Sequence, residues 1–166
     1  IITFVDTPGA FCGKQAEERG QGEAIAKNLY EMMGFEVPIL SIVISEGGSG
    51  GALGIAVANE VWMLENSIYS VISPEGCASI LWKDSSKVKE AAGVLKLTSY
   101  DLHEFKIIDK IVDELGEGAH VTKNEIAKNM KDEILGFIER FKGKSGEEIK
   151  EHRYKKFRKI GEYGIE

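Results

Sequence analysis

The sequence predicts an α/β fold with a mainly parallel sheet and a helical C-terminal part. Two strand-like runs, residues 1–5 and 38–45, each lead through a glycine-rich turn into a helical run, residues 15–33 and 51–59. Strands that alternate with helices in this way form right-handed βαβ units, which pair their strands in parallel.

Three further strands are expected downstream, and helices fill most of the remaining sequence. The strands lie near residues 61–64, 68–72 and 107–112. In the first predicted helix, Gly20 and Gly22 each cost about 1 kcal/mol relative to alanine. Glycines kept at such a cost suggest close packing of this helix against a neighbour.

Capping patterns mark where four of the helices begin. A serine or threonine followed three residues later by an acid can cap the first free amides of a helix. Three such pairs are Thr98 with Asp101, Thr122 with Glu125, and Ser145 with Glu148. Ser73 before Pro74 predicts the fourth start, because serine caps well and proline suits the first helical position.

Composition and charge indicate an ordinary globular chain. It is 43% hydrophobic and 29% charged, with a formal net charge of −6. This acidic balance argues against dedicated nucleic-acid binding, which needs a basic face to neutralise phosphates. No apolar run reaches the ~18 residues that a membrane span needs. Cys12 and Cys77 are too few for a zinc site or a disulfide framework, which predicts reduced thiols in a metal-free, cytoplasmic protein.

The most informative segment is Ser45–Gly54, a glycine-rich stretch that joins a strand to a helix. Glycines let backbone N–H groups approach a ligand without Cβ interference, and the helix N-terminus adds partial positive charge. A similar stretch, Asp6–Gly13, precedes the first helix, so we expect both sets of amides at the same edge of the sheet. Neither carries an obvious acid, base or metal-ligand pair, which favours chemistry by backbone dipoles aimed at developing negative charge.

Other interpretations of the same glycines remain open at this point. Gly47–Gly51 matches the G-x-S-x-G nucleophile elbow, so Ser49 is a candidate nucleophile of a serine hydrolase. Such an enzyme needs a histidine and an acid downstream. The available histidines, none in a motif that would position it, are His103, His120 and His152. A dinucleotide fingerprint would require glycine at Leu53, and the glycines could instead only permit a tight turn.

Four longer motifs are far more specific: Asp6–Ala10, Glu17–Gly20, Glu46–Leu53 and especially Tyr69–Lys83. Together they closely resemble the carboxyltransferase α subunit of bacterial acetyl-coenzyme A carboxylase, and the resemblance runs across nearly the whole chain. The sequence departs from that family's pattern at Phe11–Cys12, where tyrosine–proline is common.

The resemblance implies a crotonase-like fold in which backbone amides polarise a thioester or ureido carbonyl. It implies transfer of a carboxyl group from carboxybiotin, carried on a separate protein, to acetyl-CoA. The product would be malonyl-CoA, in the first committed step of fatty-acid biosynthesis. The released biotin can itself remove the acetyl proton, so the protein need supply only positioning and amides. The alternatives are another biotin-linked acyl-CoA carboxylase or decarboxylase of this fold, a non-catalytic assembly subunit, and a serine hydrolase using Ser49.

Three groups of site residues follow from the resemblance. The principal oxyanion hole would comprise the backbone amides of Gly50, Gly51 and Ala52. The loop supplying an opposing donor would comprise Gly9, Ala10, Phe11, Cys12 and Gly13. Substrate contacts would come from Gly47, Gly48 and Ser49. By analogy with related carboxyltransferases, this half of the active site is expected to hold the biotin ureido oxygen.

The resemblance also implies partners. These are a zinc-ribbon-containing carboxyltransferase β subunit in an α2β2 assembly, the biotin carboxyl carrier protein, and biotin carboxylase in the full complex. Residues 1–142 would be the carboxyltransferase core, with its N-terminal part missing, and residues 143–166 a C-terminal helical extension. The candidate contacts with the β subunit are Gly20, Gly22, the apolar residues around Ile80, Leu81 and Trp82, and the basic final helix.

That final helix is locally basic. Residues 142–160 hold eight lysines and arginines against three glutamates. A solvated, docked terminal helix is the default interpretation of such a segment. A contact with a partner or with CoA phosphates is the functional alternative.

Overall fold

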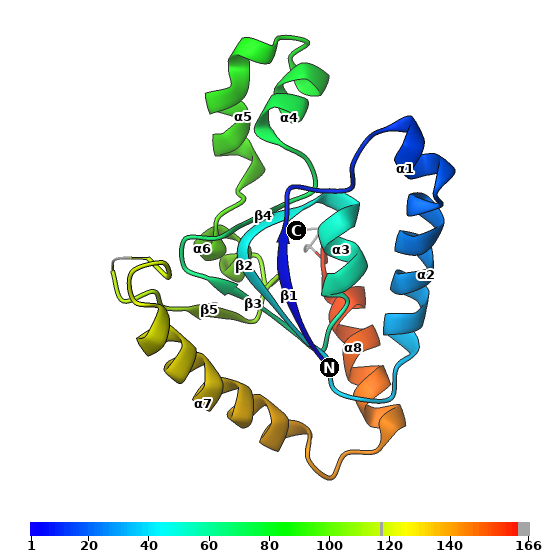
Figure 1. The fold of residues 1–166 in the computed structure, drawn as a ribbon, viewed down its shortest axis with the longest axis vertical. Coiled ribbons are helices and arrows are strands. Elements are labelled where there is room, and N and C mark those ends of the chain that lie inside the picture. Colours follow the sequence, from blue (N-terminus) through cyan, green and yellow to red (C-terminus); the bar gives the residue numbers. More distant parts are fainter. Residues whose placement is uncertain (117, 163–166) are drawn as a thin grey trace.

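The computed structural model describes residues 1–116 and 118–162, and it shows an α/β fold built on a parallel sheet (Figure 1). Within this described part, the sheet has five strands in the order β1–β2–β3–β5, and β4 pairs with β2 beside this path. All the strand pairs are parallel. The strands are β1 (Ile2–Thr7), β2 (Leu40–Gly48), β3 (Glu60–Leu64), β4 (Ile68–Ser70) and β5 (Lys110–Val112).

Helices connect most of these strands, as the sequence predicts, and a short turn joins β3 to β4. The early ones are α1 (Lys14–Glu18), α2 (Gln21–Gly34) and α3 (Ser49–Ala56). The central ones are α4 (Pro74–Leu81), the 3₁₀ segment η1 (Ser85–Lys87), α5 (Val88–Leu95) and α6 (Ser99–Glu104). The last ones are α7 (Lys123–Phe141) and α8 (Gly146–Lys159). None of the described helices combines the length and apolarity needed to cross a membrane.

Strand β2 has two successive neighbours along one edge. Its first half, Leu40–Val43, pairs with β3, and its last residues, Glu46–Gly48, pair with β4. The second pairing sets Tyr69 opposite Gly47. The apolar first half of β2 therefore lies in the core, and Gly47 near its end lies beside Tyr69.

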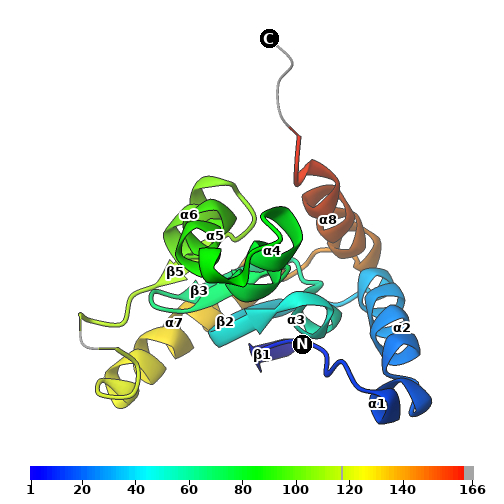
Figure 2. The same ribbon diagram turned by 90° about the horizontal axis from the view of Figure 1, so that it is seen from above.

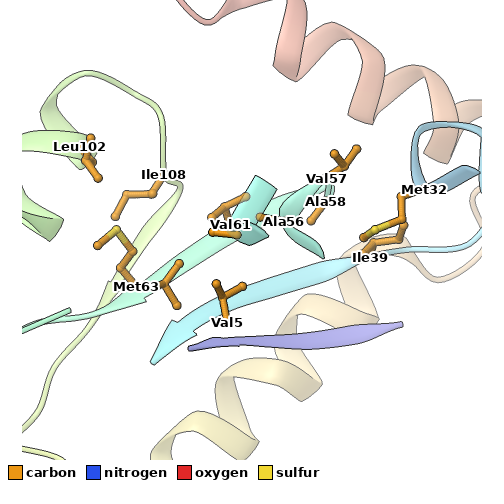
Figure 3. Close-up of a cluster of buried hydrophobic side chains, with 12 residues drawn as sticks. Val5, Met32, Ile39, Ala56, Val57, Ala58, Val61, Met63, Leu102 and Ile108 are labelled. Carbon is orange, nitrogen blue, oxygen red and sulfur yellow. The ribbon is translucent and has the colours of Figure 1, made fainter. Parts of the chain in front are cut away.

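Helices cover both faces of the sheet, and each face has its own apolar cluster. Figure 2 shows α7 on one side and α6 and α8 on the other. The cluster in Figure 3 joins side chains of β1–β3, such as Val5 and Val61, to residues of α2, α3 and α6, such as Met32 and Leu102. The second cluster packs Trp62 against Phe137 of α7. Each fully buried side chain of this size contributes roughly 1.5–3 kcal/mol through apolar burial.

The first predicted helix, residues 15–33, is wrong as one continuous element. It is divided into α1 and α2 at Gly20, whose φ of +79° lies in the left-handed region. Glycine enters that region without the steric cost that other residues meet. Within the described chain no element packs closely on Gly20 or Gly22, because a Cβ at either position would meet nothing nearer than a flexible glutamate side chain. Their contact with a β subunit stays a prediction.

Three of the four predicted caps form. The side chains of Ser73, Thr98 and Ser145 accept hydrogen bonds from backbone amides, and Ser145 makes a complete capping box with Glu148. Thr122 does precede α7, but its hydroxyl donates to the carbonyl oxygens of Glu114 and Gly118 instead. The Thr122 hydroxyl therefore bonds to the preceding loop and does not cap α7, which the sequence pattern does not reveal.

Helices α4 and α5 form a hairpin that stands away from the sheet (Figure 1). Its small apolar cluster contains Cys77, Ala78 and Ala91, which pack against one another within the hairpin. Ile80 and Leu81 lie on its surface with 66% and 63% of their area exposed. The hairpin therefore presents apolar side chains that its own packing does not cover.

Helix α8 lies beside α2 and contributes to the core. Ile149 belongs to the same apolar cluster as α7, and Arg153 is completely buried. The division of the chain after residue 142 stays a prediction, and residues 163–166 of the proposed extension lie outside the described part. The packing of α8 shows that this helix is built into the body of the fold.

Candidate active site

The two glycine segments meet at the edge of the sheet, as their position after parallel strands predicts. Thr7 at the end of β1 pairs with Gly47 near the end of β2. A Cβ at Gly48 would overlap the carbonyl oxygen of Pro8, and a Cβ at Gly51 would lie 2.7 Å from the amide nitrogen of Ala10. Both glycines are therefore required because the first loop rests directly on the start of α3.

Helix α3 begins earlier than predicted, at Ser49 rather than at residue 51. Strand β2 continues to Gly48, so strand and helix join without intervening loop residues. Ser49 makes the turn with a φ of +50°, and the N-cap residue Gly48 has no side chain to cap the helix. The first amides of a helix have no acceptor within it, so the first turn of α3 offers N–H groups to a ligand.

The early start changes which amides are free. Those without an acceptor inside the helix belong to Ser49, Gly50 and Gly51. Ala52, which the sequence analysis placed in the oxyanion hole, stands at the first position whose amide donates within the helix. It is also fully buried. The geometry therefore supports Gly50 and Gly51 as donors, adds the amide of Ser49, and gives Ala52 a packing role.

The first loop, Gly9–Gly13, is held by side chains from both of its ends. The Thr7 hydroxyl accepts a hydrogen bond from the amide of Gly9 and donates one to its carbonyl oxygen. The Gln21 amide, oriented to satisfy both partners, donates to the Phe11 carbonyl at 2.8 Å and accepts from the Phe11 amide at 2.9 Å. These bonds occupy the amides of Gly9 and Phe11, so the opposing donor nearest to α3 is Ala10.

Cys12 and Gly13 complete this loop. Cys12 is exposed as a free thiol, and the amide of Gly13 donates to the Phe11 carbonyl. A Cβ at Gly13 would collide with the ring of Phe11, which is itself 72% exposed. The outer part of the loop thus shapes its turn, and the donor position lies at its inner end.

A cavity of about 510 Å³ opens beside the first turn of α3. It is lined by α3, β3, β4, α5, α6 and α8, and most of its lining side chains are apolar, including Leu53, Leu102 and Phe157. The lining side chains that carry polar atoms are Ser49, Tyr69 and Ser70. An apolar, mostly preformed cavity with a few polar groups at one end is typical of a small-molecule site.

A smaller cavity of about 260 Å³ lies on the other side of α3. It is lined by Gly9, Ala10 and Gly51 at one end and by α2 residues such as Ile25 at the other. The first turn of α3 therefore faces two cavities, with Ser49 and Gly50 at the larger one and Gly51 at the smaller one.

The larger cavity has no histidine or carboxylate among its described lining residues. The three histidines lie elsewhere, in α6, after β5 and in α8. His152, for example, lies 3.3 Å from the side-chain nitrogen of Asn59 and packs edge-on against Phe141. Burial lowers the pKa of this histidine. Ser49 has the backbone geometry of a strained turn, but the described residues that line the cavity beside it include no histidine or carboxylate to act as a base.

Two residues that the sequence analysis did not assign shape this cavity. Tyr69 is one of its lining residues, and burial raises the pKa of its phenol. Phe157 of α8 forms part of a wall. Tyr69 lies within a motif that was noted, but its position opposite Gly47 depends on the pairing of β2 with β4, which no local pattern shows.

The basic character of α8 has a structural explanation for several of its residues. The buried guanidinium of Arg153 donates to the carbonyl oxygens of Met32, Phe35 and Val37 at 2.7–3.0 Å. Lys156 pairs with Asp109. These contacts fix α8 against the C-terminal end of α2 and against the turn before β5. They leave fewer positive charges for a partner or for CoA phosphates than the sequence suggests.

Among the described residues, no cluster of three or more His, Cys, Asp and Glu side chains is arranged to hold a metal ion. The chemistry that the site itself offers is hydrogen bonding from amides and hydroxyls next to an apolar cavity. Together with the parallel sheet, this agrees with the crotonase-like fold that the resemblance implies, in which backbone amides stabilise oxyanions.

The family model described as acetyl co-enzyme A carboxylase carboxyltransferase-like matches residues 1–161, and the chain belongs to this family. It is 59% identical over 160 residues to the acetyl-coenzyme A carboxylase carboxyl transferase subunit alpha of Clostridium perfringens, covering 96% of this chain and 59% of that protein. It is 57% identical over 163 residues to the subunits beta/alpha protein of Natranaerobius thermophilus, covering 98% of this chain and 27% of that protein. The chain thus spans about six-tenths of the length of its separate α-subunit relative.

Solved structures show the same fold. The β subunit of geranyl-CoA carboxylase from P. aeruginosa superposes with a TM-score of 0.64 at 15% identity. The superposition covers 82% of this chain and 28% of that one. At this identity the likeness bears on the fold alone.

Proposed function

We propose that this chain forms the α-subunit part of a carboxyltransferase that moves a carboxyl group from carboxybiotin to acetyl-CoA and gives malonyl-CoA. The observation that carries the proposal is the uncapped first turn of α3, whose amides open beside an apolar cavity without a histidine or carboxylate in its described lining. A site of this kind suits a reaction in which the protein stabilises negative charge on oxygen and does not itself take up a proton.

In this proposal the residues of the chain have limited, specific roles. The amides of Ser49 and Gly50 donate to a developing oxyanion at the larger cavity. The amides of Gly51 and Ala10 act as donors on the side of α3 that faces the smaller cavity. The apolar walls exclude water, which strengthens these hydrogen bonds. Carboxybiotin, a substrate on its carrier protein, supplies the carboxyl group and a ureido nitrogen that can accept the acetyl proton. We assign the biotin side of the reaction to this half of the centre and the thioester side to the partner.

The proposal includes a β subunit as partner, in an α2β2 assembly served by the biotin carboxyl carrier protein and biotin carboxylase. A relative with β and α subunits in one chain supports a close association of the two. We assign the contact to the apolar surface of the α4–α5 hairpin, which includes the exposed side chains of Ile80, Leu81 and Trp82, because nothing in the hairpin covers it. The cytoplasm is the proposed compartment, and both cysteines are free thiols.

The test is an exchange assay between malonyl-CoA and biocytin, with the full-length α subunit in the presence and absence of β. We expect label from the malonyl carboxyl group to appear in carboxybiocytin only when both subunits are present. Release of the label solely as carbon dioxide would favour a decarboxylase. Exchange by β alone, at the rate of the pair, would make the α chain an assembly subunit.

A further inference from the structure

Two of the three hydroxyls that line the larger cavity have no hydrogen-bond partner among the described residues. The Ser70 hydroxyl is occupied, because it donates to the carbonyl oxygen of Ile72 at 2.8 Å. The hydroxyls of Ser49 and Tyr69 make no hydrogen bond within the described part of the chain. A hydroxyl left free at the polar end of an apolar cavity is a donor available to a ligand.

The ring of Tyr69 is held in one place by its surroundings. Strand β4 sets it opposite Gly47, and a Cβ added to Gly47 would lie 2.8 Å from a ring carbon. The ring therefore occupies the space that a side chain at Gly47 would fill. On the other side of its strand, the Tyr69 amide donates to the carbonyl oxygen of Leu97 at 3.0 Å. Gly47, assigned above to substrate contact, is thus explained as the platform for this ring.

A fixed phenol suits hydrogen bonding to a ligand oxygen. It is a neutral donor that is protonated at neutral pH, and burial raises its pKa further. A hydrogen bond from a hydroxyl to an oxygen that gains negative charge is about twice as strong as one between neutral groups. Little entropy is lost on binding, because the packed ring is already ordered.

From this geometry we infer that Tyr69 is a further catalytic residue, whose hydroxyl donates a hydrogen bond to a carbonyl oxygen of the substrate in the larger cavity. Ser49 and Gly50, in the first turn of α3, line the same cavity. The inference rests on the proposed function, since it assigns a role within the same cavity. The ligand oxygen is a carbonyl flanked by apolar groups, which both a ureido ring and an acyl thioester provide.

The experiment uses Tyr69→Phe in the full-length α subunit assembled with β. The substitution removes only the hydroxyl and keeps the ring against Gly47. We expect kcat/KM for malonyl-CoA/biocytin exchange to fall about ten- to a hundredfold, with the melting temperature near that of the wild type. A change confined to the KM of biocytin assigns the contact to the ureido oxygen. A change confined to the KM of malonyl-CoA assigns it to the thioester.

The matched control is Tyr100→Phe, which removes a hydroxyl that donates to Glu65 outside the cavity. Its kcat/KM should equal that of the wild type. Unchanged kinetics for a folded Tyr69→Phe protein, or an equal loss in Tyr100→Phe, would overturn the inference.

A second measurement separates a catalytic phenol from a structural one. Replacing Tyr69 by 3-fluorotyrosine keeps the shape and lowers the phenol pKa, so the alkaline limb of the kcat/KM profile should move to lower pH. An unmoved limb would count against the inference even if Tyr69→Phe failed to fold. Calorimetric binding of biocytin and of malonyl-CoA to the same proteins decides the role of Tyr69 even if the wild-type complex shows no exchange, a result that would refute only the proposed function.

Discussion

Replacing Gly51 by alanine should damage catalysis more than it damages the fold. An ideal Cβ at this position lies 2.7 Å from the amide nitrogen of Ala10 and from the carbonyl carbon of Gly9, and both atoms belong to backbone. Ordinary contact begins near 3.4 Å, so the first loop must withdraw by about 0.7 Å. A displacement of this size moves the Ala10 donor away from the first turn of α3.

The expected effect on turnover is about a hundredfold loss of kcat. A misplacement near 1 Å and the loss of one oxyanion donor each cost on this order. The effect on stability is smaller, because the ~1–3 kcal/mol cost of overpacking is partly offset by the ~1 kcal/mol that alanine gains over glycine within a helix. We expect a folded αβ complex with weak exchange activity.

Gly54→Ala is the matched control on the same helix. Its added Cβ would lie 3.6 Å from the nearest atom, a side-chain carbon of Ile25, which is ordinary contact. It makes the same chemical change and gains the same helix propensity, but it leaves the loop in place. Exchange activity and thermal unfolding are measured on both variants. Equal activity of Gly51→Ala and Gly54→Ala in folded complexes would refute the link between the loop and the amides of α3.

Four further predictions test other parts of the structure. Ser49→Ala should keep exchange activity within about tenfold, because the described lining of the cavity beside this hydroxyl holds no histidine or carboxylate that could act as a base. A fluorophosphonate should leave the wild type unlabelled, and stoichiometric labelling would support a serine hydrolase instead. Trp82→Ala should weaken association with β by more than about tenfold, as measured by sedimentation. Undiminished association together with a lowered melting temperature would show that Trp82 acts in core packing and not in the interface. Arg153→Met should lower the free energy of unfolding by about 3–5 kcal/mol, because three carbonyl groups lose their hydrogen-bond donor. Urea titrations measure this change, and a loss below about 1 kcal/mol would contradict the prediction. Because the pKa of His152 is lowered in the folded state, the unfolded chain binds a proton more readily than the folded chain does. The free energy of unfolding should therefore be highest above about pH 6.5 and fall as the pH drops below it. His152→Gln should flatten this dependence in denaturation curves from pH 7.5 to 5.

The elements set by local pattern were predictable. Residues 1–5 and 38–45 are short apolar runs followed by turn residues, which is typical of strands buried in a parallel sheet. The hydroxyl–acid pairs at Thr98 and Ser145 act through groups only three residues apart. The family and the meeting of the two glycine segments could also be inferred, because parallel strands end at one edge of a sheet. Local chemistry decides the strands and the caps, and the shared edge of a parallel sheet decides where the two glycine segments meet.

Features that depend on distant contacts could not be predicted. The sequence pattern places Gly20 inside one continuous helix. Only its left-handed conformation shows that it separates α1 from α2. Tyr69 reaches the cavity because β4 pairs with the last residues of β2, a register that joins segments 22 residues apart. In the sequence, Arg153 is one of many positive charges on a helix expected to be solvated. Its burial depends on carbonyl groups more than 100 residues earlier in the chain, which no local pattern reveals.

The burial of Arg153 has a consequence for synthesis on the ribosome. Its guanidinium bonds to the carbonyl oxygen of Met32, 121 residues earlier in the chain. At about 5–20 residues per second, the end of α2 therefore emerges roughly 6–25 s before the side chain that satisfies it. Throughout this interval the cavity lacks the wall that Phe157 supplies, so the nascent chain exposes apolar surface of the kind that chaperones bind. Helix α8, which is translated long after α2, is the element that closes this cavity.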